Sequence, residues 1–257
     1  MIKKFIICIT ASFYLAGFSQ AADLTELIEK RISQDRKILD LKGLNIGPKG
    51  AKQLSKMKSL SSLVTLQLQG NRIKARGIKA LSKSPYLSNL KHIDLYGNLL
   101  GDLGLKAIAE SPYFGNLESL KLWKNEISDD SMKFLSSSKN FSKLKILMLN
   151  DNLITDIGAT IISKTQNLSN LTTLNLFRND VGDRGSLAFA KSVIFSKLES
   201  FYIGENNITD IGAVALIKSK TFPALKFLDL GNNMLGEASA LAAFKVNRQD
   251  KVRVLYK

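Results

Sequence analysis

The chain has 257 residues, of which 37 are basic and 22 acidic, and 45% of all residues are hydrophobic. This balance predicts an ordered chain and excludes an intrinsically disordered one. With only 4 Pro, 17 Gly and 23% charged residues, collagen-like, linker-dominated and supercharged classes are excluded as well. The length allows one or two ordinary domains or one array of repeats.

The first 21 residues have the pattern of a secretory signal peptide. Two lysines, Lys3 and Lys4, precede an apolar run over residues 5–18. Ser19 and Ala21 then supply the small residues that a signal peptidase needs. The run is shorter than the roughly 20 apolar residues of a bilayer-spanning helix, so a retained anchor is the weaker alternative. We therefore predict an exported protein, periplasmic or secreted, with cleavage after Ala21.

Cleavage at this position would also remove Cys8, the one cysteine of the chain. Cys8 lies inside the apolar run and does not follow a small-residue cleavage site, so we do not interpret it as a lipidation site. Without cysteine, the mature chain can form no disulfide, no thiolate nucleophile and no cysteine-based metal site.

The rest of the chain is predicted to be one array with a cap at its start. Residues 22–35 favour a short capping helix, because apolar residues recur there at helical spacing. From Arg36 on, the sequence repeats every 27 residues without insertion or deletion. This period predicts eight units over residues 36–251. Residues 252–257 begin a ninth unit as an edge strand, with Val252 and Leu255 at its inward places.

Each unit opens on the same pattern, as in the segment from Leu63 to Ile73. Alternating apolar residues such as Leu66 and Leu68 predict a short strand with one face inward. An Asn at the ninth place is expected to bond backbone groups where the chain turns. It recurs as Asn71, Asn98, Asn125, Asn152, Asn179, Asn206 and Asn233.

The second half of each unit predicts a helix, because capping residues such as Thr155 precede apolar residues at helical spacing. One column of each unit holds glycine, which we interpret as a place where the helix packs closely on the strand. Its members are Gly77, Gly104, Gly158, Gly185 and Gly212.

The pattern LxxLxLxxNxL and its period resemble the leucine-rich repeat proteins, in particular the ribonuclease-inhibitor-like class and its bacterial members with N-x-I-x-D-x-G units. The resemblance covers residues 36–251. The first unit departs from the pattern at Arg36 and Leu44, as terminal repeats often do. The resemblance implies an α/β solenoid, a curved horseshoe with a parallel β-sheet on the concave face and helices on the convex face. It implies ligand binding by the concave strand residues and no shared active site.

The side chains at the third, fifth and seventh places of each unit face outward from the strands and define a candidate binding surface. Large aromatic residues gather there in units three, four, six and seven, with basic neighbours, which is typical of a protein-binding hot spot. The alternative is that the rings only shield neighbouring strands. The predicted partner-binding residues are Tyr96, Lys121, Trp123, Lys124, Met148, Asn150, Phe177, Arg178 and Tyr202.

Lysines form two further columns, on the predicted helices. One column holds Lys52, Lys79, Lys106 and Lys133, and the other Lys56, Lys83, Lys164, Lys191, Lys218 and Lys245. We favour a role in solubility and in offsetting the helix macrodipole, with weak contact to an anionic surface as the alternative. No nucleic-acid partner is expected, because lysine far outnumbers arginine and the leader directs export.

A catalytic role would have to rest on His92, the only imidazole. Thr65 and Ser119 are predicted to lie beside it on neighbouring strands, and Asp94 two residues along the same face. A regular strand face supplies neither a pocket nor free backbone donors for an oxyanion, so this set does not make a catalytic triad. We predict a protein that is not an enzyme and has no cofactor or metal.

The sequence therefore predicts an exported, non-catalytic scaffold that recognises a protein partner through its concave face. The alternative is a surface adhesion or glycan-binding module that stacks sugar rings on the aromatic strip. A monomer is favoured, because Arg253 and Lys257 would blunt the edge strand. Without such blunting, two copies could join edge to edge.

Overall fold

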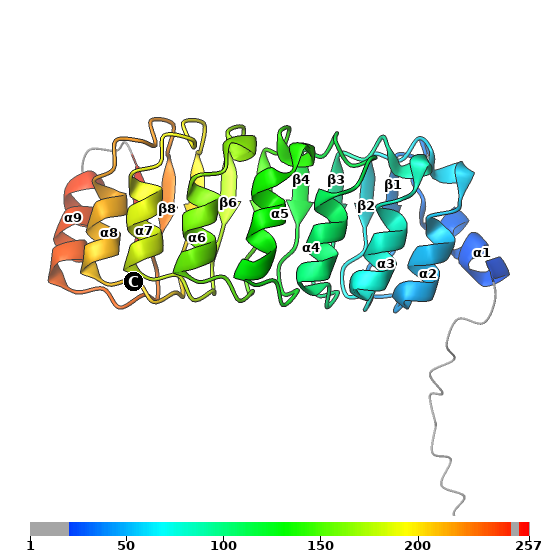
Figure 1. The fold of residues 1–257 in the computed structure, drawn as a ribbon, viewed down its shortest axis with the longest axis horizontal. Coiled ribbons are helices and arrows are strands. Elements are labelled where there is room, and N and C mark those ends of the chain that lie inside the picture. Colours follow the sequence, from blue (N-terminus) through cyan, green and yellow to red (C-terminus); the bar gives the residue numbers. More distant parts are fainter. Residues whose placement is uncertain (1–20, 248–251, 257) are drawn as a thin grey trace, which may run out of the picture.

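The protein is described by a computed structural model, which covers residues 21–247 and 252–256. Within these ranges, nine short strands form one open parallel sheet in chain order (Figure 1). They are β1 Ile38–Asp40, β2 Thr65–Gln67, β3 His92–Asp94, β4 Ser119–Lys121, β5 Ile146–Met148, β6 Thr173–Asn175, β7 Ser200–Tyr202, β8 Phe227–Asp229 and β9 Arg253–Leu255. We call the sheet surface that is turned away from the helices the strand face.

Helices α2 to α9 lie side by side in one layer over the other face of the sheet, and α1 lies at the N-terminal end of the row (Figure 1). The helices are α1 Ala21–Arg31, α2 Gly47–Leu54, α3 Lys74–Leu81, α4 Gly101–Ala109, α5 Met132–Ser137, α6 Asp156–Ser163, α7 Asp183–Ala190, α8 Asp210–Ile217 and α9 Glu237–Asn247. This layering confirms the predicted α/β solenoid. Among the described residues, no helix combines the length and the apolar character needed to cross a bilayer.

The core consists of side chains stacked at the same place in successive units. Leu120, Leu147 and Leu174 pair across β4, β5 and β6 and are 0% exposed. Each therefore packs against its counterpart in the units before and after it, and no unit can bury its apolar face alone.

The repeated Asn forms the predicted ladder of buried side-chain hydrogen bonds. The Oδ1 of Asn98 accepts from the backbone N–H groups of Asn71 and Ile73 at 3.2 and 3.1 Å. Its Nδ2 donates to the carbonyl oxygens of Leu68 and Leu95 at 2.8 and 2.9 Å. One side chain thus satisfies the turn of its own unit and of the preceding unit, which confirms the expectation for this residue.

The helices begin in two different ways along the array. In the later units an aspartate from the preceding helix reaches the next helix start, as when Asp183 accepts from the backbone N–H groups of Thr209 and Gly212, both at 2.9 Å. Helices α2, α3 and α4 instead begin at a residue in the left-handed region, namely Gly47, Lys74 and Gly101. Carboxylates therefore link successive units only in the later part of the described array.

The glycine column reflects contact between neighbouring helices, and our interpretation of helix packing on strand was wrong. A Cβ built on Gly185 would lie 2.8 Å from Ala159 Cβ and 2.9 Å from Asp156 Oδ1, both on the preceding helix α6. The backbone N–H of Gly185 donates to that same carboxylate at 2.7 Å. Glycine is needed here because adjacent helices approach too closely for a side chain.

We expect Gly185→Ala to destabilise the protein by about 1–3 kcal/mol, because the added methyl overpacks the contact with α6. Gly115→Ala is the matched control, since a Cβ at Gly115 would meet only Asn140 Oδ1 at 3.6 Å, an ordinary contact. Urea unfolding of both variants measures the difference. Equal stability of the two variants would show that the helices can separate without cost.

Helix α1 covers the N-terminal end of the core. Leu24 and Ile28 are 2% and 1% exposed, and Ile32 forms an antiparallel bridge with Leu39 of β1. The helix ends at Arg31, whereas the sequence favoured a capping segment over residues 22–35.

The ninth strand is shifted by one residue from the predicted register. Val254 pairs with Leu228 and is 4% exposed, whereas Leu255 is 41% exposed. The expectation of Leu255 at an inward place was therefore wrong, because a shift of one residue turns a strand side chain to the other face. Lys257, which we expected to blunt this edge, lies outside the described residues.

The outer edge of β9 carries a side-chain amide in place of a neighbouring strand. The N–H of Arg253 donates to the carbonyl of Lys226, and the carbonyl of Leu255 accepts from the N–H of Leu230. The N–H and C=O of Val254, between them, therefore face away from β8. Asn247, the last residue of α9, meets both of them. Its Oδ1 accepts from the N–H of Val254 at 2.7 Å and its Nδ2 donates to the C=O at 3.1 Å.

Candidate functional site

Two aromatic residues at the seventh place of adjacent units form a stacked pair on the strand face. The rings of Tyr96 and Trp123 lie 3.9 Å apart between centroids with an interplanar angle of 25°, and both residues are half-buried. Asp94 fixes the first of them, because its Oδ1 accepts from the backbone N–H of Tyr96 at 3.1 Å. We call Tyr96 and Trp123 the aromatic pair.

Three further rings, Phe177, Tyr202 and Phe227, belong to units six, seven and eight, and we refer to them together as the aromatic cluster. Tyr202 and Phe227 lie 5.3 Å apart between centroids. Phe177 lies against Gly204, where an added Cβ would come within 3.0 Å of the ring. Phe227 was not among the predicted binding residues, although its outward position on β8, the strand beside that of Tyr202, was a usable signal.

Strand β5 separates the aromatic pair from the aromatic cluster. Met148 is half-buried there, and Asn150 is only 9% exposed. The Nδ2 of Asn150 donates to Asp151 at 3.1 Å. The strip expected from the sequence is therefore two groups of rings with a flexible apolar side chain and a buried amide between them.

The charged residues of the strand face are mostly paired with one another. Lys121 Nζ lies 3.7 Å from Asp94 Oδ2. Arg178 bridges two units, with Nε 2.6 Å from Glu205 and Nη1 3.2 Å from Asp151. These carboxylates raise the pKa of the Arg178 guanidinium, and the hydrogen bond that Arg178 donates to Glu205 contributes most.

Arg178 and Lys124 occupy a turn position that glycine fills in the first three units. Their φ angles are +53° and +55°, in the left-handed region that non-glycine residues rarely adopt. Side chains at strained positions of this kind are often functional. Lys124, which is exposed, directly follows Trp123, and Arg178 directly follows Phe177. Both basic residues thus lie beside aromatic residues at the carboxyl ends of the strands.

His92 lies in register between Thr65 and Ser119, as expected. Ser119 is 6% exposed, and Asp94 is engaged by Tyr96 and Lys121. In the described part of the chain, no hydrogen bond joins His92 to either of them. The same residues contain no group of three or more His, Cys, Asp or Glu side chains placed to hold a metal ion.

The carboxylate of Glu118, which directly precedes β4, has a strongly lowered pKa. Lys145 Nζ lies 2.7 Å from Glu118 and Lys91 Nζ lies 3.0 Å from it. These hydrogen bonds, with that from Lys145 the largest, lower the pKa of Glu118 from 4.5 to about 2. The ionised form is therefore favoured in the folded state, and its contribution to stability is lost as the pH falls from about 4.5 through 2.

We expect Glu118→Gln to reduce the free energy of unfolding at pH 7 by about 1 kcal/mol, since both lysines are solvent-exposed and the pairs are screened. The deficit should shrink as the pH falls below 4.5 and should vanish only below pH 2, where the carboxyl group is protonated in the folded state as well. Glu199→Gln is the control, because Glu199 has one lysine partner, Lys226. Unfolding curves across this pH range test the prediction, and a deficit that does not shrink between pH 4.5 and pH 2 would contradict it.

The repeated strand, turn and helix define the class. The family model described as "Leucine Rich repeat" matches residues 59–82, 86–109, 167–190 and 196–216. The chain is a leucine-rich repeat protein.

Two solved structures from Listeria monocytogenes are similar in fold. An internalin (inlF) has 19% sequence identity and a TM-score of 0.56 over 93% of this chain and 64% of its own. An internalin C2 (inlC2) has 23% identity and a TM-score of 0.55 over 86% of this chain and 81% of its own. The chain thus spans 64% of the length of the first. No curated protein matches the sequence.

Proposed function

We propose that this leucine-rich repeat protein is an exported, non-catalytic scaffold that binds another protein through its strand face. The stacked aromatic pair carries the proposal. Two large half-buried rings are held just after adjacent strands of the sheet and stack on each other, so little conformational entropy remains to be lost on binding. The leader-like pattern of residues 1–21 supports export, and residues 1–20 of it lie outside the described residues.

The surroundings of the aromatic pair are those of a protein interface. The rings of the aromatic pair lie together on the strand face, and charged residues that already have partners lie beside the aromatic residues. A large apolar centre with a polar rim is the arrangement of binding hot spots. Lys124 adds a charge without a partner among the described residues, which can select the orientation of the partner.

We expect Trp123→Ala to weaken binding of a partner captured from envelope and culture supernatant by at least about 2 kcal/mol. Isothermal titration with the purified partner measures the loss. Ile157→Ala is the control, because Ile157 is an apolar side chain that is 65% exposed on the helix side. Unchanged affinity after joint substitution of Trp123 and Phe177 by alanine would contradict the proposal.

Binding to sugars would give a different result. A glycan-binding surface needs a free ring face, whereas each ring of the aromatic pair covers one face of the other. A glycan array with competition by free saccharide tests this alternative. Saccharide binding that depends on Trp123 would replace the protein-binding proposal.

A further inference from the structure

One stretch of this protein, from the first unit to the start of the third, carries positive charge only. Between Asp40 and Asp94 the sequence has 11 lysines and arginines and no acidic residue. The later units mix both signs. The chain therefore has a region of uniform positive charge, distinct from the strand face discussed above.

Six of these residues form a regular grid on helices α2 and α3 and the turns that follow them. Within each unit they are three and then four residues apart, a spacing that places them on one helix face. Corresponding members are 27 residues apart, and α2 and α3 lie side by side (Figure 1). We call the set the basic patch: Lys49, Lys52, Lys56, Arg76, Lys79 and Lys83.

All members of the basic patch are solvent-exposed. In residues 21–247 and 252–256 none of them forms an ion pair. The next unit differs, because Lys106 lies 3.8 Å from Glu110. The charge of the basic patch is thus not neutralised within the described fold.

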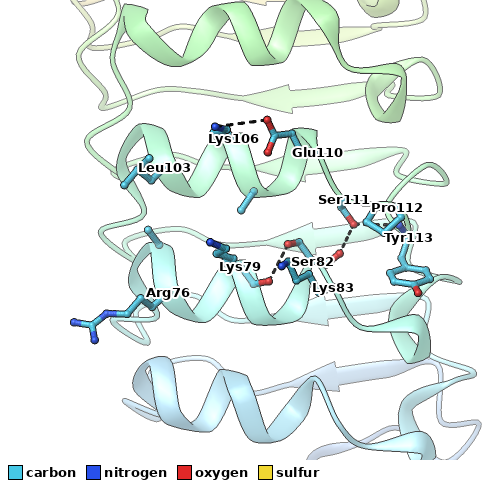
Figure 2. Close-up of a pocket in the computed structure, with 12 residues that line it drawn as sticks. Arg76, Lys79, Ser82, Lys83, Leu103, Lys106, Glu110, Ser111, Pro112 and Tyr113 are labelled. Carbon is cyan, nitrogen blue, oxygen red and sulfur yellow. Dashed lines mark hydrogen bonds and ion pairs between the residues drawn. The ribbon is translucent and has the colours of Figure 1, made fainter.

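Two grooves with apolar floors run through the basic patch and share Arg76. One, of about 740 Å³, is lined by Leu24, Ile46 and Pro48 among others. The other, of about 660 Å³, lies between α3 and α4. In Figure 2, Arg76 projects outward near the start of α3, and Lys79 and Lys83 follow along the chain.

The second groove exposes apolar surface beside the charges. The groove is open because the small side chains of Ala75 and Ala107 line it, and Leu103, which also lines it, is 71% exposed. Farther along the array Phe134 takes the place that corresponds to Ala107, and the amines of Lys106 and Lys133 lie 5.0 and 5.2 Å from its ring centre. Open apolar surface beside unpaired cations therefore occurs between α3 and α4 and does not continue to the next pair of helices, α4 and α5.

We infer that the basic patch docks the protein on a bilayer surface rich in anionic lipid. A partner of mixed charge would leave some of these cations unmatched, whereas a layer of phosphate head groups presents one sign only. Lysine is a hydrated point charge that suits such a layer, and exposed Leu103 can enter the head-group region. The strand face, on the opposite side of the sheet, stays free.

Vesicle co-sedimentation tests the inference with a chain that begins at Ala21 and keeps every described element. The probes are vesicles of phosphatidylcholine alone and vesicles that also contain phosphatidylglycerol, at physiological ionic strength. We expect binding to the anionic vesicles only, and weaker binding as salt is added. Equal binding to both kinds of vesicle, or binding to neither, would overturn the inference.

Two charge-matched variants locate the surface. The first replaces Lys49, Lys52, Arg76 and Lys79 with glutamine, and the control replaces the exposed Lys164, Lys191, Lys218 and Lys245 in the same way. Since each basic residue near an anionic bilayer strengthens binding by about fivefold, the first variant should lose more than about tenfold and the control far less. Equal losses would show that total charge, and not the basic patch, governs binding.

An acidic peptide is the competing ligand. Soluble poly-glutamate that binds the wild-type chain in a manner dependent on the basic patch, while anionic vesicles do not bind, would assign the grooves to an acidic protein segment and overturn the membrane inference. Because neither experiment involves Trp123 or Phe177, its outcome is independent of the function proposed for the strand face.

Discussion

Asn98→Ala is expected to lower the free energy of unfolding by about 3–5 kcal/mol. Asn98 is 0% exposed, and the backbone N–H groups of Asn71 and Ile73 have its Oδ1 as their hydrogen-bond partner. Alanine would leave both N–H groups buried and unsatisfied, at about 1–3 kcal/mol each. The carbonyls of Leu68 and Leu95 would each lose one of their donors.

Asn89→Ala is the matched control for this experiment. Asn89 is exposed and donates a single hydrogen bond to the carbonyl of Ser61, so its loss should cost at most about 1 kcal/mol. Urea unfolding followed by circular dichroism compares the two variants. A similar midpoint for both would mean that water replaces the Asn98 side chain and that the ladder does not hold the turns.

Leu147→Ala is expected to destabilise the array by about 2–5 kcal/mol, the sum of lost transfer free energy and of a cavity that cannot close. Leu147 is 0% exposed and lies in the column between Leu120 and Leu174. Because stability in a repeat array depends on the contacts between neighbours, the loss should spread to the flanking units.

Hydrogen exchange resolves this spread along the chain. The amides of β4 and β6 should lose protection together with those of β5, whereas β1 and β2 should change less. Ile146→Ala is the control, since Ile146 is the preceding residue and faces outward, half-buried. A loss of protection confined to β5 would contradict coupling between units.

The sequence predicted the fold because the repeat is redundant. Eight strands from Ile38 to Asp229 stand where the 27-residue period places them, since every unit supplies the same alternation of inward and outward residues. The period placed β9 one residue too late, because β9 begins 26 and not 27 residues after the start of β8. No complete unit follows from which the shift could have been recognised. Val254 thus took the inward place that Leu255 was expected to fill.

For the candidate site, the sequence predicted which side chains face outward from the strands, but not which contacts they make with one another. The period placed Tyr96 and Trp123 side by side, and they stack. It could not show that Arg178 bridges Asp151 and Glu205, because those contacts depend on a left-handed turn at a position without glycine. The contact between Phe227 and Tyr202 could have been predicted, because the period places both at outward positions of neighbouring strands.

A strand that adds to the free edge of β9 would have to displace the side-chain amide of Asn247. Any incoming strand, whether from a second molecule or from an unfolded chain, would need the N–H and C=O of Val254, which already hold two hydrogen bonds at 2.7 and 3.1 Å. The exchange gains nothing at that residue, since each bond formed replaces one that is lost. This exposed edge therefore resists templated aggregation without a charged or proline residue at its centre.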